Sequence, residues 1–516
     1  MTRISRRGLL TTGAAAGVLA ASGLPLRAQA KKGGRLRAGL SGANTSDNWD
    51  GRTHSDLFMI ASAQGAVFDS LTEIAPDGSL RGELATDWEA TPDAKTWTFN
   101  LRSGVTFHNG KAFGADDVIE SLQMHIAEGA KSAAKPIVEP IVEMKKTGDL
   151  QVQLTLAEGN ADLPYLLSDY HILIYPAGMI EEAIAKGIGT GLYQVQSFEP
   201  GVRFVGTRYP DHYKGDEAGF FDEIEYIAIN DNTARMNALM TGQVDAINRI
   251  DFKTEALLKA NPMIRIQEVT GNQHYTFPML TNLAPYSDVN VRKALKHGIN
   301  RQEMVDKILL GHGQVGNDSP IGPANQYYLE MEQLAYDPDK AKFYLKEAGM
   351  ESIDIDLSAS SAAFEGAVDA AQLFQASAKA GGININVVQE PADGYWSNVW
   401  LKKPFCASYW SGRATEDWMF STAYAEGAPW NDSQWGSEDS ARFQELLVNA
   451  RAELDSAKRR DMYGEMQMIL RNEGGVLVPM FANYVQAISN KVASPDKVGN
   501  LWQMDNARMA ERWWMA

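Results

Sequence analysis

Half of the twelve tryptophans lie within residues 396–435, near the carboxyl end of the chain. Aromatic rings offer a large contact area and lose little conformational freedom on binding, so such a cluster suits a pocket for apolar or cationic groups. Some of these rings must serve the core, but we expect at least two of them in a ligand site, with Trp410 and Trp430 favoured. The six are Trp396, Trp400, Trp410, Trp418, Trp430 and Trp435.

Catalytic patterns are missing from the sequence. The eight histidines show no pair at i, i+4 and no HExxH motif, so a helical zinc site is unsupported. Residues 311–316 match GxGxxG but follow a helical pattern, which is the wrong setting for a dinucleotide. Residues 104–111 come near a phosphate-binding loop, yet Ala112 stands where a hydroxyl is needed. The sequence therefore predicts a protein that is not an enzyme, with no cofactor and no metal site.

Length and composition indicate a folded chain with more than one lobe. The 516 residues exceed the size at which a single core usually keeps growing. Hydrophobic residues make up 44% and charged residues 22%, which are ordinary globular values. The formal net charge of −17 and the lack of a long basic run argue against nucleic-acid binding.

The first thirty residues have the pattern of an export signal. Arg6 and Arg7 precede a stretch rich in Ala, Gly and Leu, and residues 28–30 (AQA) place small residues at a cleavage site. We therefore expect twin-arginine export to the periplasm, with cleavage after Ala30. The alternative is a membrane anchor, but the uncharged run is diluted by Gly, Thr and Ser. Cys406 is the only cysteine, which excludes an intrachain disulfide.

Periodicity predicts mixed secondary structure. Alternating apolar residues predict strands at 97–101, 152–156 and 224–226. Helical spacing predicts helices at 119–126 and at 236–240, the second of which ends before Gly242.

The second half of the chain carries clearer boundaries. Asn300 begins a capping-box pattern, and Asp337 followed by proline marks another helix start. Residues 353–357, 363–380 and 383–388 read as strand, helix and strand, which predicts a right-handed β-α-β unit with parallel strands.

Several motifs recur in order along nearly the whole mature chain. Together they resemble the extracellular solute-binding proteins of family 5, the oligopeptide, dipeptide and nickel class of ABC importers. The motifs are residues 67–72 (VFDSLT), 84–89 (LATDWE), 97–110 (WTFNLRSGVTFHNG), 115–118 (ADDV), 189–193 (GTGLY), 239–245 (LMTGQVD) and 287–295 (SDVNVRKAL).

The resemblance implies an α/β fold with two lobes joined by a hinge, of the large class II (cluster C) type, with mixed sheets flanked by helices. It implies a discontinuous lobe one from 31–267 plus 481–516, and lobe two from 268–480. It also implies a monomer that captures a short peptide or related small amino compound and delivers it to a membrane permease and ATPase.

One motif departs from the family pattern. A segment resembling GWxADYPDPDxF carries, in the family, an aspartate that meets a peptide's amino group; aligned on Phe420, Arg413 holds that position here. Arginine matches carboxylate or phosphate groups, so an acid-bearing ligand is a reasonable hypothesis. Glu416 or Asp417 would instead hold a cation, which is an alternative to the acid-bearing ligand. The alternative is an internal ion pair between Arg413 and one of these two acids.

Family position also points to His274, Tyr275 and Trp49 as ligand contacts. Three other functions stay open at this stage. An opine-like or other carboxylated ligand rivals the peptide, a metal chelate or haem would require His or Met facing the pocket, and a secreted hydrolase would require a nucleophile or metal cluster in the cleft.

Overall fold

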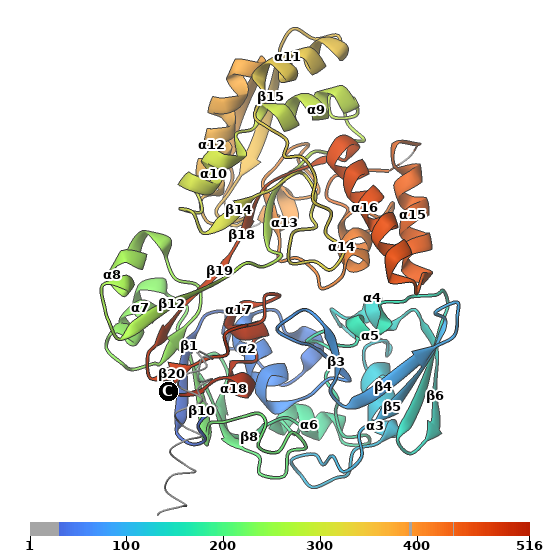
Figure 1. Ribbon diagram of the computed structural model, residues 1–516, viewed down its shortest axis with the longest axis vertical. Coiled ribbons are helices and arrows are strands. Elements are labelled where there is room, and N and C mark those ends of the chain that lie inside the picture. Colours follow the sequence, from blue (N-terminus) through green and yellow to red (C-terminus); the bar gives the residue numbers. More distant parts are fainter. Residues whose placement is uncertain (1–29, 392–394, 437) are drawn as a thin grey trace, which may run out of the picture.

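The computed structural model describes residues 30–391, 395–436 and 438–516, so residues 1–29 of the expected export signal lie outside the described residues. The chain forms two lobes, which lie one above the other in Figure 1. The prediction of a two-lobed α/β fold with mixed sheets is thereby confirmed. Among the described helices, none combines the length and apolar character that a membrane span requires.

Lobe one is built on a seven-stranded mixed sheet in the order β12-β19-β11-β1-β10-β9-β8. The central strand β1 runs parallel to β10 and β11, and the remaining pairs are antiparallel. Ile224 and Tyr226 of β10 are fully buried, in agreement with the predicted strand. The strands are β1 (Arg35–Leu40), β8 (Tyr193–Glu199), β9 (Arg203–Arg208), β10 (Glu223–Ala228), β11 (Ala246–Ile247), β12 (Ile264–Val269) and β19 (Tyr484–Ser489).

A second, antiparallel sheet in lobe one has the order β4-β5-β7-β6. The two predicted strands are confirmed as β5 and β7, whose alternate side chains are buried in one core. Helix α3 (Ala115–Gln123) packs on this sheet but ends before the expected Ile126, because the chain turns after Gln123. The strands are β4 (Ala85–Ala90), β5 (Thr96–Leu101), β6 (Ile141–Gly148) and β7 (Gln151–Leu156).

Short helices and strands complete lobe one. Helix α7 ends at Met240 and Gly242 adopts φ +74°, as the sequence predicted for a helix stop. The helices are α2 (Leu57–Ser62), α4 (Lys135–Val138), α5 (Leu163–Leu166), α6 (Ile180–Lys186), α7 (Asn232–Met240), α8 (Glu255–Lys259), α17 (Gln503–Asn506) and α18 (Met509–Arg512). The short strands are β2 (Thr72–Ile74), β3 (Leu80–Gly82), β20 (Val492–Ala493) and β21 (Trp514–Met515).

Lobe two contains a four-stranded sheet and a parallel strand pair. The sheet has the order β14-β18-β13-β17, and its strands are β13 (His274–Pro278), β14 (Gly313–Val315), β17 (Ser408–Trp410) and β18 (Val476–Ala482). The parallel pair, joined by α12, confirms the predicted β-α-β unit. Its elements are β15 (Ile353–Ala359), α12 (Ala367–Ala378) and β16 (Ile383–Gln389).

Further α-helices surround these strands. The side chains of Asn300 and Asp337 accept hydrogen bonds from the first turns of α10 and α11, which confirms both predicted starts. The helices are α9 (Val289–Gly298), α10 (Arg301–Lys307), α11 (Pro338–Glu347), α13 (Tyr395–Asn398), α14 (Glu416–Ala423), α15 (Ala441–Ala452) and α16 (Ser456–Glu473).

Two chain segments connect the main sheets of the two lobes. The first lies between β12, which ends at Val269, and β13, which begins at His274. The second is the single residue Asn483 between β18 and β19, and Figure 1 shows these strands running from one lobe into the other. The two connections between the lobes therefore lie next to each other, because β12 pairs with β19 and β13 pairs with β18.

Candidate functional site

A cavity of about 990 Å³ lies between the lobes. Lining residues of lobe one include several within 163–171, those of lobe two include several within 411–414, 417–422 and 428–430, and those of the C-terminal segment lie within 501–508. Cavities of this size hold small organic ligands. Because its walls come from both lobes, a molecule inside would contact both at once.

Arg413 lies on the lobe-two wall, in the loop between β17 and α14. Its Nη1 donates to the backbone oxygen of Gly412 at 2.7 Å, and its guanidinium lies over the rings of Trp410 (5.6 Å) and Trp418 (5.5 Å). Burial lowers its pKa, while the charges of Tyr170 and nearby groups oppose this shift. Arginine stays protonated in proteins. A positive charge is therefore held at the cavity wall.

Within the described ranges no carboxylate forms an ion pair with Arg413. Asp417 pairs instead with Arg451, at 3.2 Å between Oδ1 and Nε. Glu416 is buried and accepts a hydrogen bond from the backbone N–H of Tyr327 at 2.7 Å. The alternative of an internal pair between Arg413 and Glu416 or Asp417 is therefore wrong, because helix α14 turns both acids toward other partners.

The two acids differ in their access to the cavity. Asp417 lines it, and Glu416 does not. Burial raises the pKa of Asp417 to about 6 and that of Glu416 to about 7. Glu416 lies behind the wall, so the structure places it as a support for the loop that carries Tyr327 rather than as a ligand contact.

The loop that carries Arg413 depends on a glycine. Gly412 has φ +80°, and a Cβ there would lie 2.6 Å from the backbone oxygen of Asn272. The Asn272 side chain in turn donates to the backbone oxygen of Arg413 at 3.2 Å. Asn272 lies in the first segment between the lobes, so this contact links the position of Arg413 to the lobe connection.

The two favoured tryptophans occupy different environments. Trp430 is half exposed and lines the cavity. Trp410 is buried, and its Nε1 donates to Asp432 at 3.2 Å. Contrary to expectation, Trp410 does not line the cavity but lies behind Arg413 and Trp430, and Trp418 joins Trp430 as the second tryptophan of the 396–435 cluster in the wall.

Three residues chosen by family position do not line the cavity. His274 is fully buried beside Trp410 in the sheet, and burial lowers its pKa to about 4. Tyr275 stacks on Phe364 at 4.1 Å between ring centroids. Trp49 is buried in the core of lobe one. The structure corrects these expectations, because His274 and Trp49 are buried in the protein interior and the partly buried Tyr275 packs against the core of lobe two.

Sequence reasoning missed the lobe-one wall. Asp169, Tyr170 and His171 follow α5 and line the cavity, and Tyr170 meets Trp502 of the C-terminal segment edge-on at 5.5 Å. No periodic pattern or motif marks residues 169–171, since they lie in an irregular loop. Their position beside Trp502 depends on a contact between distant parts of the chain.

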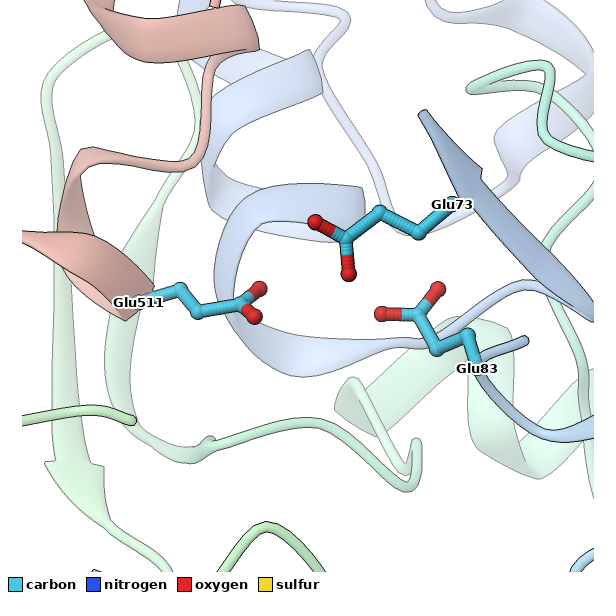
Figure 2. A group of neighbouring side chains, drawn as sticks. All are labelled: Glu73, Glu83 and Glu511. Atoms are coloured by element: carbon cyan, nitrogen blue, oxygen red, sulfur yellow. The ribbon is translucent and has the colours of Figure 1, made fainter. Parts of the chain in front are cut away.

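A group of three buried acids could be mistaken for a metal site. Figure 2 shows the carboxylates of Glu73, Glu83 and Glu511 pointing toward one another. The ammonium of Lys214 lies 2.7 Å from Glu511 and 3.1 Å from Glu83, and Arg508 pairs with the same two acids at 2.8 and 2.7 Å. The protein's own cations thus balance these acids, so the group joins α18 to lobe one.

Hydrolytic chemistry finds no support among the described residues of the cavity wall. The wall includes four serines, and none of their hydroxyl groups is hydrogen-bonded to a histidine.

Two lobes joined by two neighbouring segments around a ligand-sized cavity are the architecture of a bilobal solute-binding protein. The chain belongs to family 5 of the bacterial extracellular solute-binding proteins, since residues 79–432 match the model of the family's middle region. The predicted family is thereby confirmed.

Curated relatives are periplasmic binding proteins. The nickel-binding periplasmic protein of Escherichia coli (strain K12) is 29% identical over 300 residues, a match that covers 56% of each chain. The dipeptide-binding protein of the same strain is 26% identical over 466 residues, covering 82% of this chain and 83% of that relative. The family is one of transport binding proteins rather than enzymes.

Solved structures show the same fold. The periplasmic binding protein DppA from Helicobacter pylori, in complex with peptide STSA, has a TM-score of 0.77 at 20% identity, with 94% of this chain and 99% of that chain covered. The binding protein AgaA from A. tumefacien R10, in complex with agropinic acid, gives a TM-score of 0.77 at 21% identity, with coverage of 94% and 99%. At these identities the likeness establishes the fold alone.

Proposed function

We propose that this chain is the periplasmic substrate-binding component of an ABC importer and that it captures a carboxylate-bearing small molecule, such as a short peptide or related amino compound. The observation that carries the proposal is the guanidinium of Arg413, which lies on the cavity wall and has no acidic partner among the described residues. A planar guanidinium binds a carboxylate through two parallel hydrogen bonds.

The aromatic wall supports the same ligand class. Trp418 and Trp430 line the cavity beside Arg413, and Tyr170 and Trp502 lie in the opposite wall. Rings of this kind hold the apolar part of a ligand while a charged group fixes its orientation. A carboxylated non-peptide ligand, opine-like in character, is the second candidate, because a protein of the same fold binds agropinic acid.

Lobe closure would couple binding to delivery. The hinge in this proposal consists of the segment between Val269 and His274 together with Asn483. The lobe bounds expected from the sequence, 31–267 plus 481–516 for lobe one and 268–480 for lobe two, fall close to this hinge. A ligand that contacts both lobes stabilises the closed state, which the permease and its ATPase would recognise.

The pattern of the N-terminal residues supports export through the twin-arginine route. The proposal includes a twin-arginine signal cleaved after Ala30, a periplasmic location and a monomeric mature protein that does not bind nucleic acid. Twin-arginine export carries folded proteins, and this suits a chain whose only cysteine, Cys406, is buried and free.

Native mass spectrometry of mature protein (residues 31–516), followed by denaturation, tests the proposal. We expect a co-purified molecule that carries a carboxylate, and Arg413→Gln should release it or weaken its rebinding about tenfold or more. A ligand without an acidic group, bound equally well by Arg413→Gln, would refute the proposed role of Arg413.

A further inference from the structure

The lobe-one wall carries a second charged centre, formed by Asp169 and His171. Oδ1 of Asp169 accepts a hydrogen bond from the backbone N–H of His171 at 2.9 Å and lies 2.6 Å from its Nδ1. On the other side of the ring, Nε2 lies 2.8 Å from the backbone oxygen of His54. Both side chains are almost fully buried yet line the cavity.

The two ring nitrogens of His171 lie against oxygen atoms on both sides, the Asp169 carboxylate on one side and the His54 backbone oxygen on the other. Burial by itself would raise the pKa of Asp169, but the charge and hydrogen bonds of His171 hold it below its ordinary value. Asp169 is thus ionised at neutral pH.

One oxygen of Asp169 is left for a ligand. The printed contacts of the carboxylate all use Oδ1, and among the described residues no hydrogen bond reaches Oδ2. His171 therefore orients the carboxylate, and the second oxygen is available beside the cavity. An ammonium group is the natural partner for such an oriented anion.

Asp169 faces Arg413 across the cavity. The two residues line it from opposite lobes, and their charges influence each other without forming an ion pair in this structure. The other charged groups of the wall are less available. Arg508 is held in its acid cluster, and Asp417 is paired with Arg451. The remaining acid, Glu158, is exposed to solvent.

We infer that Asp169 binds the ammonium group of a zwitterionic ligand whose carboxylate is held by Arg413, with His171 as the residue that positions Asp169. The inference rests on the proposed function and narrows its ligand class to molecules with both an ammonium and a carboxylate group. Each lobe then holds one charge of the ligand. Closure around a molecule that lacks the ammonium would leave Oδ2 of Asp169 without a hydrogen-bond partner.

Isothermal titration with matched probes tests the inference. The probes are free di- and tripeptides and free amino acids, each compared with its N-acetylated form, which keeps the carboxylate and removes the ammonium. We expect acetylation to weaken binding to the wild type about tenfold or more, and to matter less than about threefold in Asp169→Asn. Glu181→Gln is the matched control, because it removes an exposed acid of lobe one that does not line the cavity and should retain the wild-type preference.

The outcomes separate the two proposals. Acetylated probes that bind as tightly as free ones, while still requiring Arg413, would overturn the role of Asp169 and leave the proposed function intact. If no carboxylate probe of either form binds in an Arg413-dependent way, both proposals fail. A ligand-free measurement tests the positioning role: the ¹⁵N NMR signals of the His171 ring should shift in Asp169→Asn and stay at their wild-type positions in Glu181→Gln. Ring signals that do not change in Asp169→Asn would contradict the inference.

Discussion

Replacing Arg508 with methionine is the sharpest test of the charge cluster that holds the C-terminal helix. Glu83 is fully buried, and Arg508 contacts it with two nitrogens, at 2.7 and 3.0 Å. Without Arg508, three buried acids would face only Lys214 and Arg512. Removing one partner of a buried ion pair costs about 3–5 kcal/mol, because the remaining charge is left unpaired in a medium of low polarity.

The size of the expected effect follows from lobe one. A loss of 1 kcal/mol lowers the melting temperature of a domain of about 150–250 residues by about 2–4 °C, so we expect a decrease of roughly 6–20 °C. Circular dichroism during heating, with urea unfolding alongside, measures it. The double variant Arg508→Met with Glu83→Gln should recover much of the loss, because the unpaired charge is removed as well.

The deficit of Arg508→Met should also depend on pH. Burial already raises the pKa of Glu83 in the presence of Arg508. Without Arg508 the folded state would bind a proton at Glu83 more strongly than the unfolded state does, so the deficit should be smaller at pH 5 than at pH 8. Arg442→Met, which removes a fully exposed arginine paired with Glu465, is the control and should leave the melting temperature unchanged. A similar melting temperature for both variants would refute the reasoning.

Two further predictions concern the cavity wall and the buried acid behind it. Gly412→Ala should displace the Arg413 loop and weaken ligand binding about tenfold, because φ of Gly412 is +80° and the new Cβ would collide with Asn272. Gly427→Ala is the control, since φ of Gly427 is +76° but no atom lies near the new Cβ. Its ligand affinity, measured by titration, should stay near the wild-type value. Glu416→Gln should reduce the loss of folding stability between pH 5 and 8. Burial raises the pKa of Glu416 to about 7 in the folded state, so the wild type loses stability as the pH rises from the pKa of the unfolded state toward 7. Urea unfolding at several pH values measures this, and an unchanged slope would assign it to other groups.

Local elements were predictable wherever a pattern repeats within a few residues. Alternating apolar side chains predicted β5 and β7, and the caps at Asn300 and Asp337 predicted the starts of α10 and α11. Boundaries were less secure, as the early end of α3 shows. A helical stripe can continue into a turn that packs on the same core, and the sequence does not distinguish the two.

The site was only partly predictable. Arg413 and Trp430 were found from a departure in a motif and from a cluster of aromatic residues, and both line the cavity. Trp410, next to them in the same cluster, is buried instead. Residue type shows what a side chain can bind, but its direction depends on which strands and loops pack around it.

The sequence by itself determined the family and the α/β class. It also showed that Arg413 stands where the motif that its segment resembles has an aspartate. These follow from residue identity and local order along the chain. Only the tertiary structure decided that Arg413 is without an acidic partner among the described residues, and that Asp169 and His171 face it from the other lobe. The physical reason is that charge pairing and access to a cavity depend on distances between segments hundreds of residues apart, and no local pattern encodes those distances.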